Sequence, residues 1–391
     1  MQVKNLLLPL ALATAAVAQD SQVNLTSALA SQNSSLSSLI GLLGTQPSLV
    51  QALGSAQNIT ILAPSNEALE QFLASPAAAG AAADPSLVAA ILTYHVLNGT
   101  HYASSFTEEP QFIPTLLQNE TYANITGGQR VQGQNVDGNV TFFSALRENS
   151  TVTNGNLNFT GGTIHIINKV LSVPTSINTT LQAANLTAAA GAINRANVGS
   201  ALSSAEDLTI FVPNNEAFRA IGSLAGSIDQ AALANILSYH VVAGSVLYSP
   251  DVTNTSVATL GGGNLTVSVV NETVFVNNAK VVVPNILVAN GVVHVIDGVL
   301  NPNNTSAQPD ATASSRPPAF SGAATATDGS NPFTSGVPAP TSTAPVATES
   351  SPNDGGGAVQ TTSSSTEAAP MRTAAVGAAA LFGGVAAYMN M

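Results

Sequence analysis

The sequence predicts two tandem α+β domains followed by a disordered stalk rich in Ser, Thr and Pro. Three observations lead to this prediction. Three sequence blocks recur in the same order along the 391 residues. Each copy begins with helical spacing of apolar residues and ends in short β-rich segments. The segment after the second copy has almost no large apolar residue. We expect domains at residues 19–173 and 174–302 and the stalk at 303–372.

The first repeated block is a β-branched strand that ends at a proline and leads into a helix. It is ITILAPSNEAL at 59–69 and LTIFVPNNEAF at 208–218. Ser65 or Asn214 can cap the helix, and the glutamate that follows suits the positive end of the helix dipole. We expect structural roles for the motif residues Pro64, Asn66, Glu67, Pro213, Asn215 and Glu216.

The second block is a helix that enters a strand, with ILTYHV at 91–96 and ILSYHV at 236–241. Asp84 and Pro85 begin the helix in the first copy, and Ser227 with Gln230 forms a capping box in the second. Apolar residues at helical spacing place one face of each helix in a core. The histidine lies at the end of that face, and the two faces comprise Leu87, Val88, Ile91, Leu92 and His95, and Leu233, Ile236, Leu237 and His240.

The third block closes each domain with a half-buried strand. It is GTIHIINKVL at 162–171 and GVVHVIDGVL at 291–300, where apolar residues alternate. Between the helix and this strand of the second copy, residues 264–270, 273–276 and 280–283 are short β-rich segments, which favour hairpins. Helices in one half and successive strands in the other indicate α+β domains rather than alternating βαβ units. From this block we expect structural roles for His165, His294 and Asp297.

The three blocks together resemble the fasciclin domain. The family pattern T-x-F-x-P-x-N-x-A-F, a Tyr-His pair and G-x-x-H-x-I-D-x-V-L fit the second copy nearly throughout, and the first copy departs from it at Leu62, Leu69, Asn168 and Lys169. The resemblance covers roughly residues 24–302. It implies a β-wedge or sandwich of short strands with helices packed alongside, and roles in cell adhesion or matrix contact. Because the segment around the Tyr-His pair is implicated in receptor contact in this family, the resemblance names Tyr94, His95, Tyr239 and His240 as adhesion candidates.

Both ends of the chain have the composition of processing signals. Residues 1–18 carry one lysine, an apolar run and Ala16-Val17-Ala18, which is the layout of a signal peptide; the alternative is an N-terminal helix of the fold. Residues 373–391 form an apolar tail behind small residues and a polar spacer, as in a glycosylphosphatidylinositol signal. A tail-anchoring helix and a disordered end are the alternatives. The anchor candidates are Asn353, Gly355 and Ser363.

The stalk and the sequons indicate a glycosylated, extracellular protein. Residues 301–370 hold ten of the 21 prolines among Ser, Thr, Ala and Gly, a composition typical of O-glycosylated stalks, although a plain disordered tail would look the same. N-x-Ser/Thr sequons are about twice as frequent as chance predicts. Asn58, directly before a predicted strand, is a weaker candidate, and Asn303 overlaps the last sequon. The N-glycosylation candidates are Asn24, Asn33, Asn98, Asn119, Asn124, Asn139, Asn149, Asn158, Asn178, Asn185, Asn254, Asn264, Asn271 and Asn304.

Composition excludes several classes of function. Nine Lys and Arg against 21 Asp and Glu leave no basic surface for nucleic acid, so no nucleic-acid partner is expected. The chain has no cysteine, which excludes disulfides, thiol nucleophiles and zinc–thiolate sites. Four of the five histidines recur at equivalent positions without a metal-binding spacing. We interpret them as structural and expect no catalytic residue, no metal and no cofactor.

We therefore expect a non-catalytic, glycosylated surface protein that mediates cell adhesion or contact with extracellular matrix or cell wall. Its partners would be surface, matrix or wall components, together with the membrane that holds its lipid anchor. An extracellular carbohydrate- or ligand-binding protein, including a carbohydrate-active one, is an alternative, but the absence of Trp and an aromatic content of 5% leave few platforms for stacking on sugars. A passive, glycan-coated wall spacer is the third hypothesis.

Overall fold

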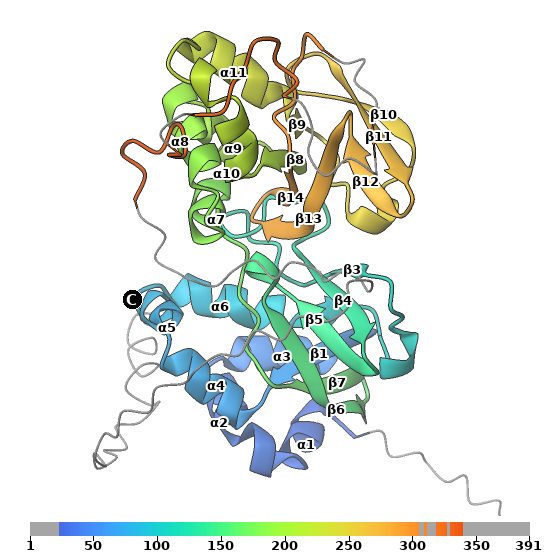
Figure 1. Ribbon diagram of the computed structural model, residues 1–391. Coiled ribbons are helices and arrows are strands. Elements are labelled where there is room, and N and C mark those ends of the chain that lie inside the picture. The colour runs from blue at the N-terminus through green and yellow to red at the C-terminus, as the bar shows by residue number, and fades with distance from the viewer. Residues whose placement is uncertain (1–22, 305–308, 311–317, 327–328, 339–391) are drawn as a thin grey trace, which may run out of the picture.

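The computed structural model describes residues 23–304, 309–310, 318–326 and 329–338. It contains two domains, each with helices along one side of a sheet, and the second domain packs on one end of the first (Figure 1). The signal peptide expected at 1–18, the tail expected at 373–391 and the anchor candidates Asn353, Gly355 and Ser363 lie outside the described residues.

Six helices form one side of the first domain. The first three precede the repeated strand, and the other three lie between it and the next strand. Serine, asparagine or aspartate side chains cap three of them through a backbone N–H of the first turn. The helices are α1 (Leu25–Ala30), α2 (Asn33–Gly44), α3 (Pro47–Ser55), α4 (Asn66–Leu73), α5 (Pro76–Ala83) and α6 (Pro85–Tyr94).

One seven-stranded sheet forms the other side, in the order β2-β1-β7-β6-β5-β4-β3. Only β1 and β7 are parallel. An antiparallel bridge between Leu97 and Thr115 brings the two sheet edges together, so the expected wedge of short strands is a single, nearly closed sheet. The strands are β1 (Ile59–Pro64), β2 (Val96–Asn98), β3 (Gln111–Pro114), β4 (Arg130–Val136), β5 (Asn139–Phe143), β6 (Asn149–Phe159) and β7 (Gly162–Ile167), with 3₁₀ turns η1 (Ala103–Ser105) and η2 (Ala145–Arg147).

The second domain repeats this architecture with the sheet order β10-β11-β12-β13-β14-β8-β9 and parallel β8 and β14. The prediction of two α+β domains is confirmed. Its helices are α7 (Ile177–Ala183), α8 (Thr187–Ala196), α9 (Gly199–Ser204), α10 (Asn215–Ala220) and α11 (Gln230–Tyr239), with 3₁₀ turns η3 (Gly222–Leu224) and η4 (Ser249–Asp251). Its strands are β8 (Leu208–Pro213), β9 (Val241–Val242), β10 (Thr255–Ala258), β11 (Asn264–Val270), β12 (Thr273–Val276), β13 (Ala279–Val288) and β14 (Gly291–Ile296).

A glycine begins the last strand of each domain because a side chain has no room there. A Cβ on Gly162 would lie 1.8 Å from the carbonyl oxygen of Ile59, and one on Gly291 would lie 1.9 Å from that of Leu208. Their φ angles of +154° and +157° are also rare for residues with a side chain. The glycine therefore allows the parallel pair of strands to approach closely in both domains.

The predicted helix caps form at three of four places. Ser65 accepts a hydrogen bond from the N–H of Ala68, and Asn214 and Asp84 cap α10 and α6 in the same way. The capping box predicted at Ser227 is wrong. Helix α11 begins two residues later than expected, because Asp229 accepts the N–H of Ala232 at 2.8 Å.

Two pieces of the predicted stalk pack on the second domain, although they form neither helix nor strand. Phe320, Ala323, Phe333 and Val337 contact its helical core, and Figure 1 shows this segment in orange and red alongside α8, α10 and α11. The structure differs here from the expectation of an unpacked stalk. The two phenylalanines are the only aromatic residues between positions 301 and 370, and they supply the apolar area that the average composition lacks.

Within the described ranges, no single helix has the length and apolar composition of a membrane span. In the same ranges, α5 and α6 taken together have that length and composition, but the two helices meet at an angle of 117°.

Candidate functional sites

The Tyr-His pairs are buried in both domains. Tyr94 and Tyr239 have relative exposures of 0% and 1%, and His95 and His240 of 4% and 2%. The hydroxyl of Tyr94 donates to the carbonyl oxygen of Arg130 at 3.0 Å, and that of Tyr239 to the carbonyl oxygen of Asn264 at 2.9 Å. None of these four side chains is offered to a partner, so a direct adhesive contact would require the surrounding segment to open.

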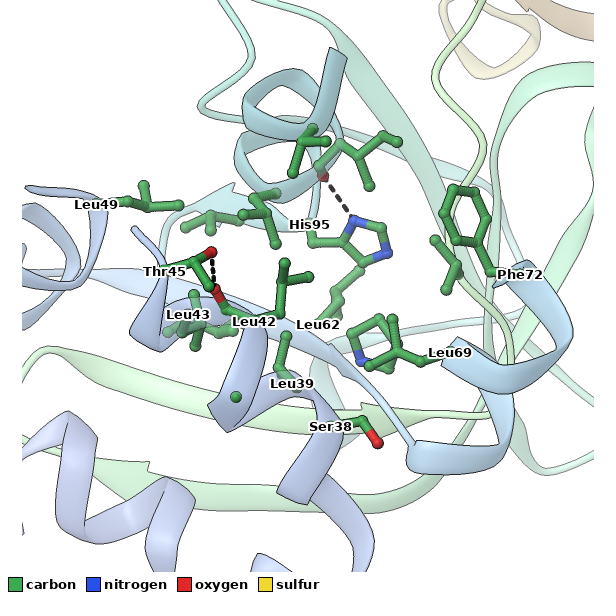
Figure 2. A pocket seen from close by; sticks show the side chains of 18 of the residues that line it. Ser38, Leu39, Leu42, Leu43, Thr45, Leu49, Leu62, Leu69, Phe72 and His95 are labelled. Atoms are coloured by element: carbon green, nitrogen blue, oxygen red, sulfur yellow. Dashed lines mark hydrogen bonds between the residues drawn. The ribbon is translucent and has the colours of Figure 1, made fainter. Parts of the chain in front are cut away.

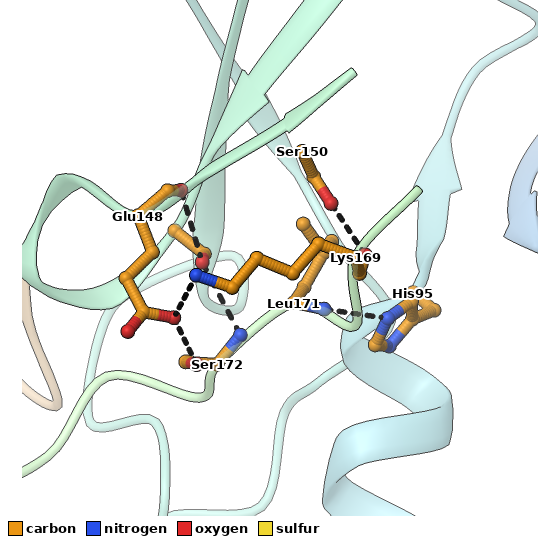
Figure 3. Close-up of polar contacts among 7 residues, drawn as sticks. His95, Glu148, Ser150, Lys169, Leu171 and Ser172 are labelled. Atoms are coloured by element: carbon orange, nitrogen blue, oxygen red, sulfur yellow. Dashed lines mark hydrogen bonds and ion pairs between the residues drawn. The ribbon is translucent and has the colours of Figure 1, made fainter. Parts of the chain in front are cut away.

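Each of these histidines joins the end of a helix to the chain after the closing strand. Nε2 of His95 accepts the N–H of Leu171 at 2.9 Å (Figure 3), and Nε2 of His240 accepts that of Leu300 at the same distance. The proton must therefore be on Nδ1, which donates to the carbonyl oxygen four residues earlier at 2.7 Å in His95 and 2.8 Å in His240. Both ring nitrogens are used, and neither is left for a substrate or a metal ion.

Burial lowers the pKa of His95 and His240 to about 4. A charged imidazole would lose its hydration, and its second N–H would point at the N–H of Leu171 or Leu300. These side chains stay neutral at the pH of most extracellular fluids and match a structural role.

The second pair of histidines fastens the closing strand to the loop after β2 or β9. Nε2 of His165 hydrogen-bonds the carbonyl oxygen of His101 at 2.8 Å, and Nε2 of His294 hydrogen-bonds that of Leu247 at 2.8 Å. Burial lowers the pKa of both, for His294 to about 4. Among the residues that the structure describes, no group of three or more His, Asp or Glu side chains is placed to hold a metal ion.

The motif asparagines link two helices in each domain. Asn66 accepts the N–H of Ser38 at 2.9 Å and donates to the carbonyl oxygen of Ser34 at 3.0 Å, which ties the beginning of α4 to α2. Asn215 makes the same pair of bonds to Ala188 and Asn185 at 3.1 and 2.8 Å.

The remaining motif residues make local contacts. Pro64 and Pro213 end β1 and β8. Glu67 is exposed in the first turn of α4, and Glu216 pairs with Arg219 at 3.2 Å. Asp297 accepts the N–H of Lys280 at 2.7 Å. Figure 3 shows Lys169 of the first domain beside Glu148, 3.5 Å apart.

The two domains meet at the connection between β3 and β4 of the first domain, which is longer than the corresponding connection of the second domain. Residues 115–129 join β3 to β4, whereas residues 259–263 join β10 to β11 in the second domain. In this connection the N–H of Asn124 donates to the carbonyl oxygen of Ala289 at 2.7 Å, and the hydroxyl of Thr126 donates to Asp207 at 2.6 Å. Gln129 donates to the carbonyl oxygen of Val288 at 3.1 Å. The sequence shows that the first copy has more residues than the second between the helix block and the closing block, but no local pattern shows that they hold the two domains together.

Aromatic stacking completes the interface beside a cleft of about 610 Å³. The rings of Phe112 and Tyr248 lie 4.0 Å apart at 14°, and the guanidinium of Arg130 lies 5.9 Å from the Tyr248 ring. Burial raises the pKa of Tyr248, whose hydroxyl has no hydrogen-bond partner in the part of the chain that the structure describes. The cleft walls also carry Asp207 and Asp251. No sequence pattern could show that these residues, far apart in the chain, meet.

An apolar cavity of about 470 Å³ lies in the first domain between α2, α4, α6 and β1 (Figure 2). Of its lining residues only Ser38, Thr45 and His95 have polar side chains, and none is charged. Leu62 and His95 line its floor, while Leu69 and Phe72 of α4 lie at its half-exposed side.

Most of the sequon asparagines lie at the surface. Asn124, Asn178 and Asn304 are half-buried, and the Asn124 side chain points into the domain interface, where its amide lies 3.4 Å from the carbonyl oxygens of Ser204 and Ala205. Asn58, the weaker candidate, is exposed. The exposed candidates are Asn24, Asn33, Asn98, Asn119, Asn139, Asn149, Asn158, Asn185, Asn254, Asn264 and Asn271.

Two copies of one module, each closed by the same buried histidines and joined by a packed interface, define a tandem α+β protein. Residues 34–174 and 184–302 match the family model described as Fasciclin domain. The matched residues make up more than half of the chain, which therefore belongs to the fasciclin family.

Relatives with the same domain occur in fungi. The chain is 36% identical over 238 residues to a fasciclin-like arabinogalactan protein of Arthroderma benhamiae, a match that covers 60% of this chain and 56% of the relative. It is 32% identical over 222 residues to the fasciclin-like arabinogalactan protein elcF of Phaeosphaeria nodorum, covering 57% and 70%. The match thus spans little more than half the length of the first relative.

A solved structure covers both domains. It is the domain pair of the insect cell adhesion molecule fasciclin I, which is 18% identical and covers 68% of this chain and 96% of that structure. With a TM-score of 0.33, this likeness adds no argument of its own.

Proposed function

We propose that this chain is a secreted, glycosylated and non-catalytic surface protein whose tandem fasciclin domains contact other cells, extracellular matrix or cell wall. Family membership supports the class of function, since the two fungal relatives are named fasciclin-like arabinogalactan proteins. The alternatives are a carbohydrate-binding extracellular protein and a passive spacer coated with glycans.

The observation that carries the proposal is the exposure of sequon asparagines over both domains. Eleven of the 14 candidates are exposed, while charged residues make up only 8% of the chain. Glycans at these positions would hydrate a surface that has few charges, and this suits a protein that works outside the cell. The surface left between the glycans is where contacts with a partner would form.

The buried histidines support a non-catalytic role. His95 and His240 have no free ring nitrogen, and their lowered pKa makes them poor proton acceptors near neutral pH. Adhesive roles for Tyr94, His95, Tyr239 and His240 stay a prediction that requires these side chains to become exposed.

The mode of adhesion would be multivalent. Two modules held in one packed pair, and many such pairs on one surface, raise the effective concentration, so that weak single contacts add up. We propose that residues 373–391 direct attachment of a lipid anchor at Asn353, Gly355 or Ser363 and that the stalk holds the pair away from the membrane. The tail and the three anchor candidates lie outside the described part of the chain.

Bead aggregation tests this proposal. Beads coated with the purified chain should clump, or adhere to cells or wall polysaccharide, and beads coated with an unrelated glycoprotein should not. Enzymatic removal of N-glycans serves as a second arm, since a passive spacer would lose its only function while protein-mediated contact would persist. Failure of coated beads to bind any of these surfaces would exclude adhesion.

A further inference from the structure

The helical side of the second domain has a groove that the chain fills with its own residues. The Phe333 ring packs edge-on against Phe218, with centroids 5.9 Å apart at 78°, and the Arg195 guanidinium lies 5.3 Å from its centroid. The backbone of Phe333 crosses α8 at Gly191, where a Cβ would lie 1.8 Å from its carbonyl oxygen. Ala326 crosses η3 at Gly222, where an added Cβ would lie 2.5 Å from the Cβ of Ala326 and 2.9 Å from its backbone nitrogen.

The cavity of the first domain is the corresponding groove, and no segment in the described part of the chain fills it. The N–H groups that Asn66 and Asn215 accept belong to Ser38 and Ala188, and this register pairs Gly41 with Gly191 and Thr45 with Arg195. The carbonyl groups to which the two asparagines donate are spaced one residue differently. The first repeated block, which contains these asparagines, sets a second correspondence between the two domains. It pairs two residues of α4 with two residues of the second domain that contact the segment around Ala326 and Phe333. They are Leu69 with Phe218 and Leu73 with Gly222.

All four counterparts line the cavity: Gly41, Thr45, Leu69 and Leu73. A Cβ built on Gly41 would meet no atom within 4 Å, whereas its counterpart Gly191 is covered by backbone. Among the residues that the structure describes, one groove is therefore filled and the other is open.

The open groove is not equipped for a peptide. In the second domain Ser223 makes two hydrogen bonds to Ala324, its N–H donating to the carbonyl oxygen at 3.0 Å and its hydroxyl accepting the N–H at 2.9 Å. Arg219 also donates to the Asn331 side chain at 3.3 Å. Their counterparts in the first domain are Ala74 and Glu70. Ala74 has no hydroxyl and its N–H already donates to the carbonyl oxygen of Glu70 at 3.1 Å, and the Glu70 side chain has no N–H to donate.

The polar atoms of the cavity are already used or lie at its rim. Both nitrogens of His95 are bonded, and the hydroxyl of Thr45 donates to the carbonyl oxygen of Leu42 at 2.7 Å. Ser38 and Thr45 are exposed. A buried amide would find no partner and would be destabilised, whereas a hydrocarbon chain needs none.

We propose that this cavity binds the single hydrocarbon chain of an uncharged amphiphile, with the chain against Leu39, Leu62 and Phe72 and the polar head at Ser38 and Thr45. The volume of about 470 Å³ lies within the range of roughly 300–1,000 Å³ that is usual for ligand sites. No lining residue is charged, so a hydroxyl head suits the rim better than a carboxylate does. This site goes beyond the proposed adhesion and does not depend on it.

Calorimetric titration of the full chain with monolaurin, an uncharged single-chain ester, tests the proposal. We expect one site per chain and weaker binding of laurate, which has the same chain but a charged head. The variant Gly41→Phe places a ring where Phe333 lies in the other domain and should weaken monolaurin binding at least about tenfold. It should fold normally, because glycine is a poor residue inside a helix.

The matched control is Gly54→Phe in α3. A Cβ on Gly54 also meets no atom within 4 Å, but Gly54 does not line the cavity. This variant should bind monolaurin as the natural chain does. Absence of binding to the natural chain, or equal binding by Gly41→Phe and Gly54→Phe, would overturn the site. Laurate binding as tight as monolaurin binding would overturn the assignment of an uncharged head. Bead adhesion by Gly41→Phe should be unchanged, which separates this site from the proposed function.

Discussion

The N–H of Leu171 donates to Nε2 of His95 at 2.9 Å, and this bond exists only while the imidazole is neutral. The second domain repeats it between Leu300 and His240. Each histidine thus joins a helix end to the segment that follows the closing strand, and it does so with the single tautomer that its two bonds define.

The first prediction concerns pH. The folded pKa of His95, His240 and His294 is about 4, below the ordinary 6.5, so the unfolded chain binds more protons between these values. The free energy of unfolding should be constant above pH 6.5 and fall as pH decreases towards 4. The loss approaches roughly 3 kcal/mol for each histidine. Urea titrations at pH 7.5 and 4.5 measure it.

Replacing one of these histidines provides the control. His240→Gln should lower stability at pH 7.5 and make the second domain less sensitive to acid, because its glutamine does not titrate. Equal stability of the natural chain at the two pH values would contradict the assigned neutral state.

The second prediction concerns the glycines of the closing strands. Gly162→Ala and Gly291→Ala should each cost roughly 4 kcal/mol or more, because the new Cβ would overlap the carbonyl oxygen of Ile59 or Leu208. Gly54→Ala is the control, and its open surroundings predict unchanged or slightly higher stability. Thermal unfolding followed by circular dichroism measures both. A melting temperature unchanged by Gly162→Ala would show that the parallel pair tolerates separation.

The third prediction concerns the link between α2 and α4. Asn66→Ala removes two hydrogen bonds and leaves their backbone partners near Ser34 and Ser38 to water, so we expect a loss of about 1–2 kcal/mol. Glu67→Ala, at the neighbouring exposed position, should change stability by less than about 0.5 kcal/mol. Denaturant midpoints compare the two, and equal effects would reduce Asn66 to an ordinary surface residue.

The fourth prediction concerns the domain interface. A double-mutant cycle of Phe112→Ala and Tyr248→Ala should give a coupling energy of about 0.5–1.5 kcal/mol, because their rings stack at 4.0 Å. Phe143→Ala paired with Tyr248→Ala is the control cycle, since no ring contact joins those two residues in the described structure. Additive effects of Phe112 and Tyr248 would mean that the stack contributes nothing to docking.

Much of each domain could be predicted from local pattern. Strand ends at proline, helix caps at Ser65, Asp84 and Asn214 and the existence of the closing strands follow from rules that act over a few residues. The expected half-burial of the closing strands is wrong, because almost every residue of β7 and β14 is buried between the helices and the rest of the sheet. Ser227 shows the limit of such rules, because Asp229 two residues later competes for the same helix end and makes the bond.

The candidate sites depend on contacts between distant segments, and for that reason the sequence did not reveal them. The cavity exists because Gly41 of α2 and Leu69 of α4 line a space that no described segment covers. The stack exists because residues 112 and 248 meet across two domains. The residues around Phe333 have the same composition as the rest of the stalk. Its packing on Phe218 is what distinguishes this residue.

The position of Asn124 makes the order of events during synthesis matter. Its domain leaves the ribosome before the second domain, so its sequon is open to a glycosyltransferase before the surface around Ser204 and Ala205 has been made. A sugar attached in that interval would occupy the place where the second domain docks. Occupancy at this one asparagine would then divide the molecules into a docked form and a hinged form. The proportion would depend on whether glycosylation of Asn124 precedes the synthesis and docking of the second domain.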